Sequence, residues 1–180
     1  GAEIAWGDVS GVRSDDCGGC GYAPIGEISK INPSKGQRAR VNYIASVSNQ
    51  GHVQFMLYCC TLTAQVFIEF LSRLTKRRQG KGKLFWIVDR HPVQRQPAVK
   101  QWLEKHSQKI ELFYLPSYSP ELNSVEYLNS EVKQGVHDKP PTRSLSQLRQ
   151  RVMSQLRKVQ KLATHVRNYF KHPLIAYAAL

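Results

Sequence analysis

The stretch Leu84–Val88, "LFWIV", constrains the fold more than any other part of the chain. It is a run of five apolar residues, rich in aromatic and β-branched side chains, and it ends at Asp89. A strand without polar alternation needs cover on both faces, which is typical of a central strand with parallel neighbours. The run therefore predicts an α/β protein whose sheet carries helices on both sides.

Patterns elsewhere predict the other strands. Alternating or continuous apolar runs indicate strands over 2–9 and 110–116, and a hairpin over 41–58 that turns at Asn49, Gln50 and Gly51. Three early strands followed by alternating helices and strands indicate a mixed central sheet flanked by helices. We expect the first strand to be at its centre.

Helical spacing of apolar residues predicts four helices. They are expected over 63–78, 93–106 and 124–137, with a last helix of about 25 residues opening at Ser144. Asn123 is expected to cap the third helix. Ser144 is expected to cap the last one, in a capping box completed by Gln147.

The charge balance points to a polyanionic partner. The chain has 180 residues, enough for one domain with a real core, and a net charge of +13 from 26 Lys and Arg against 13 Asp and Glu. Nucleic acid is the commonest partner of so basic a domain. The alternative is a basic surface that only keeps the protein soluble.

Little in the sequence indicates a membrane or a secreted protein. There is no signal peptide, lipidation motif or apolar run of membrane-spanning length, so we expect no membrane partner and a cytoplasmic location. Cys17 and Cys20 form a single CxxC, a weak zinc signal without a second pair. We expect these two and the adjacent Cys59 and Cys60 all to be reduced thiols. Because the chain begins almost inside its first strand, we expect it to be a piece of a longer protein.

Two basic stretches are candidates for contacts with the DNA backbone. The segment 76–83 holds five basic residues among eight, in a loop that either follows phosphates or is simply solvated. Beyond Asp138 there are nine Lys and Arg and no acid. The last helix therefore carries one apolar stripe, and the rest of its surface is basic. The candidate residues are Lys76, Arg77, Arg78, Lys81, Lys83, Arg149, Arg157, Lys158 and Lys161.

Three acids stand where central elements end or begin. Asp8 and Asp89 end apolar strands, and Glu126 lies in the first turn of the helix after the last strand. Side chains at such ends converge on one crevice, and converging carboxylates are tolerated when a divalent cation neutralises them. Each acid also has a simpler explanation: Asp8 as a solvated strand end, Asp89 as a turn residue before His91, and Glu126 as part of a helix cap.

Several motifs in order resemble the catalytic domain of DDE transposases from bacterial insertion sequences, in the mariner-like superfamily. They are "WGDVSGVRSD", "GYAPIGE", the hairpin, "WIVDRHPVQRQPAVKQWL" and "FYLPSYSPELNSVEYLNSEVK", with 36 residues between Asp89 and Glu126. The resemblance covers roughly 3–137. It implies an RNase H-like fold, with a catalytic domain over 1–138 and a basic helical extension of the same domain over 139–180.

The resemblance also implies the chemistry. Asp8, Asp89 and Glu126 would be the catalytic residues and would hold two magnesium ions, with manganese as a substitute, while Arg90 and His91 would contact DNA beside them. The enzyme would cleave DNA at transposon ends and join the freed 3′-hydroxyl to target DNA, usually at TA. The expected partner is double-stranded DNA in the bacterial nucleoid, with no small-molecule substrate, and a homodimer is left open.

The sequence departs from the family pattern beside the acids, at Val9, Arg90, Ser124 and Val125. Two alternatives therefore stay open: an RNase H-like nuclease that cuts without joining, and an inactive DNA-binding remnant of a transposase. A helix-turn-helix region for recognising transposon ends would have to precede the chain.

Overall fold

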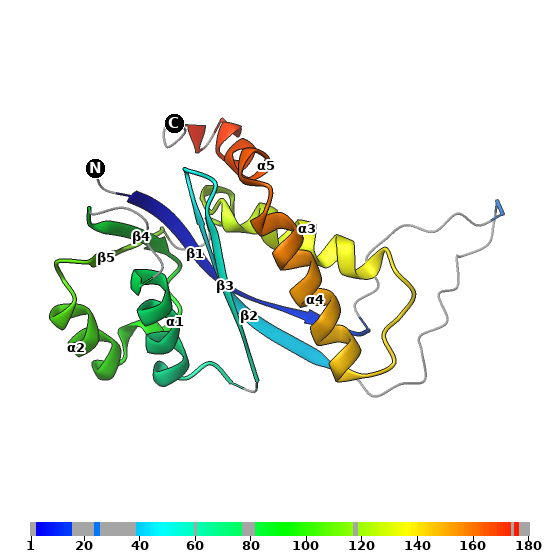
Figure 1. Ribbon diagram of the computed structural model, residues 1–180, viewed down its shortest axis with the longest axis horizontal. Helices are drawn as coiled ribbons and strands as arrows, with labels where there is room; N and C mark the ends of the chain where they lie inside the picture. The colour runs from blue at the N-terminus through cyan, green and yellow to red at the C-terminus, as the bar shows by residue number, and fades with distance from the viewer. Residues whose placement is uncertain are drawn as a thin grey trace.

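The computed structural model describes residues 3–15, 24–25, 39–59, 61–76, 82–116, 119–173 and 175–176. These residues form a five-stranded sheet with the order β3-β2-β1-β4-β5. Its strands are β1 (Glu3–Arg13), β2 (Arg40–Ser48), β3 (Val53–Tyr58), β4 (Leu84–Val88) and β5 (Ile110–Tyr114). The prediction that the first strand is central is confirmed (Figure 1).

The sheet is mixed, as predicted. β1 pairs antiparallel with β2, and β2 with β3, whereas β1, β4 and β5 run parallel. Gly51 forms the hairpin turn with a φ of 87°, a conformation that glycine adopts without strain. Its φ confirms the predicted turn between β2 and β3.

Helices cover both faces (Figure 1). On one face lie α1 and α2, and on the other lie α3, α4 and α5. Their bounds are α1 (Ala64–Lys76), α2 (Pro97–Lys105), α3 (Val125–His137), α4 (Leu145–Gln160) and α5 (Ala163–Asn168), with 3-10 turns η1 (Pro92–Arg95), η2 (Pro120–Leu122) and η3 (Tyr169–Lys171).

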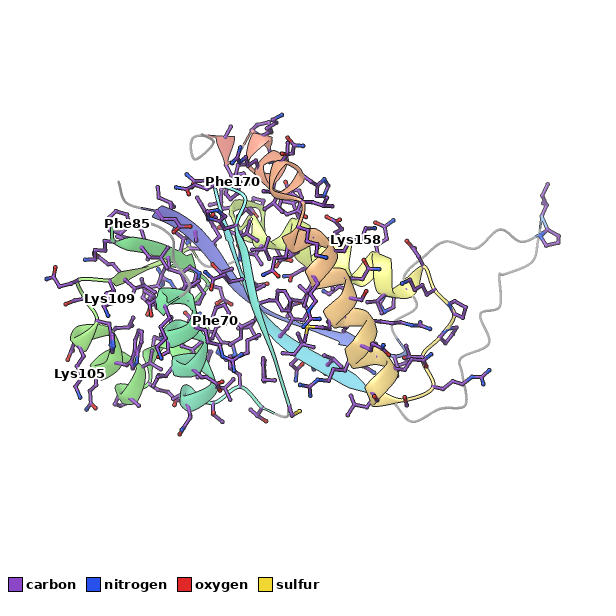
Figure 2. The ribbon with its side chains drawn as sticks, in the orientation of Figure 1. Phe70, Phe85, Lys105, Lys109, Lys158 and Phe170 are labelled. Atoms are coloured by element: carbon purple, nitrogen blue, oxygen red, sulfur yellow. The ribbon has the colours of Figure 1, made fainter. Side chains whose placement is uncertain are left out.

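The period-two alternation of the strands builds a separate core on each face. Trp86 packs with Phe67 and Phe70 under α1, with ring centroids 5.7 Å apart in both pairs. Trp6 packs with Phe170 on the other face, at 5.0 Å. Figure 2 shows Phe70 on the α1 side and Phe170 beside α5. Helical cover on both faces explains why β4 needs no polar alternation.

Two sequence-based boundaries were wrong, the end of β1 and the start of α2. β1 continues past the predicted end to Arg13, because it pairs with β2 as far as Arg40 although Ser10 and Gly11 are weak strand formers. The helix predicted over 93–106 begins only at Pro97, since a proline has no N–H to donate and is favoured in the first turn.

The predicted 25-residue helix is broken. α4 ends at Gln160, and Leu162 has φ −106° and ψ 59°, which is not helical. The break lets α5 and η3 turn so that Val166 and Phe170 reach the core beside Trp6. At the start of α4, Ser144 Oγ accepts from Gln147 N at 3.2 Å as predicted, but Gln147 Oε1 accepts from Arg143 N rather than completing the box.

Candidate active site

Asp8 and Asp89 are neighbours because of the register between β1 and β4. The last parallel pair joins Gly7 to Val88, and each aspartate is the next residue along the chain, Asp8 within β1 and Asp89 just after β4. Since side chains alternate along strands, both carboxylates lie on the face that α3 covers. Asp8 is thus in the middle of β1 rather than at its end, and it stands where the pairing with β4 stops.

Glu126 approaches the same place from α3. Leu115 N donates to Val88 O at 2.8 Å, which holds the chain after β5 against β4. Asn123 Oδ1 then accepts from Val125 N at 3.1 Å, so Asn123 caps the start of α3, although it stands one residue before the N-cap position, Ser124, whose side chain makes no capping bond. Buried Val125 and Leu128 seat α3 on the sheet, leaving Glu126 in the first turn facing the two strands.

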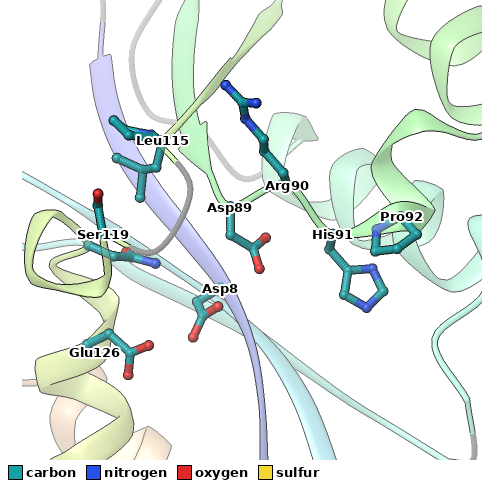
Figure 3. Close-up of a pocket in the computed structure, with 10 residues that line it drawn as sticks. Asp8, Asp89, Arg90, His91, Pro92, Leu115, Ser119 and Glu126 are labelled. Atoms are coloured by element: carbon teal, nitrogen blue, oxygen red, sulfur yellow. The ribbon is translucent and has the colours of Figure 1, made fainter.

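The three carboxylates line one cavity of about 540 Å³. Figure 3 shows the carboxyl groups of Asp89 and Glu126 directed toward that of Asp8, which lies between them. The lining residues are Asp8, Asp89, Arg90, His91, Pro92, Leu115, Pro116, Ser119, Asn123 and Glu126. Elements far apart in the sequence therefore bring all three predicted acids, together with Arg90 and His91, to one cavity.

Asp89 is held by the turn that follows it. Gln94 Nε2 donates to Asp89 Oδ1 at 2.9 Å, and Gln94 is only 1% exposed. His91 Nδ1 accepts from Val93 N at 3.2 Å and so caps η1. The ring of His91 thus both lines the cavity and organises the turn.

Asp8 is held from the opposite side. Asn129 Nδ2 donates to Asp8 Oδ2 at 2.5 Å, and the Tyr43 hydroxyl donates to Asn129 Oδ1 at 2.9 Å. Burial raises the pKa of Tyr43 above its usual value, so its hydroxyl stays protonated. Both residues were missed by sequence reasoning. The available signal was a polar Asn129 on the buried stripe of α3.

The electrostatics of the cavity favour a cation. Burial raises the pKa of Asp8 to about 7, and the negative charges of Glu126 and Asp89 act in the same direction. Hydrogen bonds from the Val9 backbone and from Asn129 lower that pKa but do not compensate. A bound divalent cation would remove the repulsion and favour the ionised carboxylate.

The cavity fits a cation because of the kind of atoms that line it, carboxylate oxygens, and not because these atoms already surround one point. No group of three or more His, Cys, Asp or Glu in the described parts of the chain is arranged to hold one ion as it stands. Three carboxylates around one cavity nevertheless supply the oxygen donors that magnesium and manganese prefer. The CxxC lies outside the described residues, and Cys59 is exposed and free.

Among the residues that the structure describes, no other predicted DNA contact lines this cavity. Lys83 precedes β4, at the opposite end of that strand from Asp89, and its Nζ lies 2.6 Å from Glu111 Oε2. Lys76 is exposed at the end of α1, and Arg77, Arg78 and Lys81 lie outside the described residues. The exposed candidates on and just after α4 are Arg149, Arg157, Lys158 and Lys161 (Lys158 is labelled in Figure 2).

No helix within the described residues is long and apolar enough to cross a membrane.

The fold and the cavity together define an RNase H-like domain in which acids from two parallel strands and one helix meet. The family model described as "DDE superfamily endonuclease" matches residues 3–149. The chain belongs to this family of DDE endonucleases.

Solved structures of the mariner Mos1 transposase share the fold. A Mos1 paired-end complex with Mg gives a TM-score of 0.66 at 15% identity, over 98% of this chain and 56% of that one. A Mos1 strand transfer complex gives 0.63 at 18% identity, over 98% and 55%. The Mos1 catalytic domain alone gives 0.57 at 14% identity, over 98% of this chain and 83% of that one.

At such identities these similarities show the fold alone. The chain spans little more than half of the transposase chains in the two complexes. A comparison of the sequence with curated proteins found no match.

Proposed function

We propose that this chain is the catalytic domain of a transposase that cleaves and joins DNA with two divalent metal ions. The observation that carries the proposal is the convergence of Asp8, Asp89 and Glu126 on one cavity. Membership of the DDE endonuclease family supports it, and so does a fold shared with the Mos1 catalytic domain, a transposase solved with Mg.

Asp8, Asp89 and Glu126 would hold the ions, with magnesium as the natural metal and manganese as its substitute. Each acid would contribute carboxylate oxygens to the metals, and Asp8 lies between the other two (Figure 3). Bound metal would supply activation of the attacking oxygen and stabilisation of the leaving oxygen in phosphodiester chemistry.

The chain's own residues would position the DNA strand. The exposed guanidinium of Arg90 lies on the cavity rim beside Asp89, where it can pair with a phosphate next to the reacting one. His91 accepts through Nδ1 from the backbone, so its Nε2 carries the proton and can donate to a phosphate oxygen. Exposed basic residues on α4 would add contacts to the backbone that do not depend on sequence.

Residues 1–138 would form the catalytic domain, and 139–180 a basic extension that shares its core. The packing of Leu148, Val152 and Leu156 of α4 into the core beside Trp6 supports one continuous domain. Double-stranded DNA would be the partner, both transposon ends and target, with TA as the expected target. A homodimer would bring two ends together, and the site of action would be the bacterial nucleoid.

The test is a pair of DNA assays on purified protein. In magnesium or manganese, wild type should nick supercoiled plasmid, and Asp89→Asn should abolish nicking. Glu104→Gln, which changes an exposed acid of α2, should leave nicking intact. If the wild-type protein nicks under no metal condition, the alternative that the chain is an inactive DNA-binding remnant of a transposase is favoured.

A second assay separates transposase from nuclease. Pre-cleaved duplexes with a free 3′-hydroxyl are mixed with a target plasmid, and joined products are scored on a gel. Joining by wild type supports transposase activity. Nicking without joining would favour an RNase H-like nuclease instead.

A further inference from the structure

We propose that Asn129 and Tyr43 are positioning residues that fix the orientation of the Asp8 carboxylate and tie it to the helix that carries Glu126. The proposal rests on the proposed function, because the task of this hydrogen-bond chain is to present the Asp8 carboxylate to the metals in a fixed orientation.

The hydrogen-bond chain runs in one direction. The side chain of Ser10 hydrogen-bonds the Tyr43 oxygen, the Tyr43 hydroxyl donates to Asn129 Oδ1 at 2.9 Å, and Asn129 Nδ2 donates to Asp8 Oδ2 at 2.5 Å. Because the Asn129 oxygen accepts from Tyr43, the amide nitrogen must face Asp8. The hydroxyl of Tyr43 therefore determines which end of the amide meets the carboxylate.

Burial makes these contacts costly to lose. Tyr43 is fully buried and Asn129 is 2% exposed, so neither polar group can exchange its partner for water. A buried amide without hydrogen bonds is strongly disfavoured, whereas an apolar side chain could fill the same place without that need. An asparagine on the apolar stripe of α3 is therefore best explained by the contact with Asp8.

The placement on α3 links two acids. Asn129 lies three residues after Glu126, so the two side chains share one side of the helix. Tyr43 lies on β2 directly opposite Ser10 of β1. The contacts thus connect β2 and α3 to the strand that carries Asp8, and they fix the position of Asp8 relative to Glu126.

One oxygen of Asp8 is used by this arrangement. Oδ2 accepts the amide hydrogen, which fixes the rotation of the Asp8 carboxylate where it lines the cavity. Residues that orient a metal ligand in this way commonly change metal affinity by about 10- to 100-fold when they are removed. Tyr43 acts one bond further away, so its removal should have a smaller effect.

The experiment measures manganese binding without DNA, by titration calorimetry on the whole chain. We expect Asn129→Ala to weaken binding about 10-fold or more and Tyr43→Phe by several-fold, whereas Asp8→Asn should bring the largest loss. Val152→Ala, a buried apolar change in α4 that alters none of these hydrogen bonds, should lower stability but keep wild-type affinity. Thermal melts in chelator show that each variant is folded at the titration temperature.

The outcomes separate the two proposals. Wild-type affinity in both Asn129→Ala and Tyr43→Phe, together with a loss in Asp8→Asn, would overturn the positioning role and leave the proposed function standing. An equal loss in Val152→Ala would also overturn it, because general loosening would then explain the effect. Absence of manganese binding by wild type would instead reject the proposed function, and the positioning role with it.

Discussion

The indole of Trp86 reaches across the central strand and donates from Nε1 to Ser46 Oγ at 3.0 Å. Trp86 belongs to β4 and Ser46 to β2, so the ring has to cross β1 between them. It crosses over Gly7, where a Cβ atom would lie 2.2 Å from Cζ2 of the ring. The residue before Asp8 is therefore a glycine for a steric reason, and Trp86 stabilises the strands that carry both aspartates.

Substitution of this glycine should destabilise the protein. Gly7→Ala forces the buried indole to move and breaks its bond to Ser46, and we expect a loss of about 1–3 kcal/mol in the free energy of unfolding. Gly11→Ala is the matched control in the same strand, because its Cβ would meet only side-chain ends of Arg40 and Asn42, which can shift. Urea denaturation measures both. Equal stability of the two variants would contradict the close contact between the Trp86 ring and Gly7.

Removal of a buried hydroxyl at the start of α3 should stabilise the protein. Ser124 is fully buried and its Oγ has no hydrogen-bond partner among the described residues. Ser124→Ala removes this unpaired group, and we expect a gain of about 1 kcal/mol. Ser130→Ala, an exposed change in the same helix, should alter stability by less than about 0.5 kcal/mol. A loss of stability in Ser124→Ala would show that the hydroxyl has a partner.

Stability and metal binding should depend on pH in opposite ways. Because the folded-state pKa of Asp8 is raised from 3.8 to about 7, its contribution to stability is present at low pH and is lost as pH rises toward neutrality. Metal binding requires the ionised carboxylate, so magnesium should raise the melting temperature more at about pH 8 than at about pH 6. Asp8→Asn should remove most of this difference. A magnesium effect independent of pH would contradict it.

DNA binding should depend steeply on salt. The net charge of +13 and the exposed cations of α4 predict binding dominated by release of counterions. Arg157→Gln with Lys158→Gln should reduce the slope of log affinity against log salt by about 1–2. Lys83→Gln, whose cation already pairs with Glu111, should change the slope less. Affinity that hardly changes between low and moderate salt would contradict the electrostatic account.

The sequence predicted the elements that carry strong patterns. The apolar run of β4, the hairpin around Gly51 and the acids Asp8, Asp89 and Glu126 could all be recognised, because strand burial, turn chemistry and motif spacing are local properties. Placing the acids at one cavity needed the resemblance as well, since spacing alone does not fix the register between β1 and β4.

The parts that could not be predicted depend on contacts between distant residues. Gln94 and Asn129 are polar residues in otherwise helical patterns, and only the fold shows that each donates to an aspartate. The break at Leu162 is set by packing of Phe170 against Trp6, which no periodicity indicates. The extra length of β1 likewise comes from pairing with β2 rather than from strand propensity.

The most direct test of the central claim is a crystal soaked in manganese, with anomalous density collected at the manganese edge. The account predicts two peaks within the cavity, about 4 Å apart, both within coordination distance of Asp8, with one also touching Asp89 and the other Glu126. Peaks that avoid these carboxylates, or a cavity without anomalous density at saturating manganese, would contradict it.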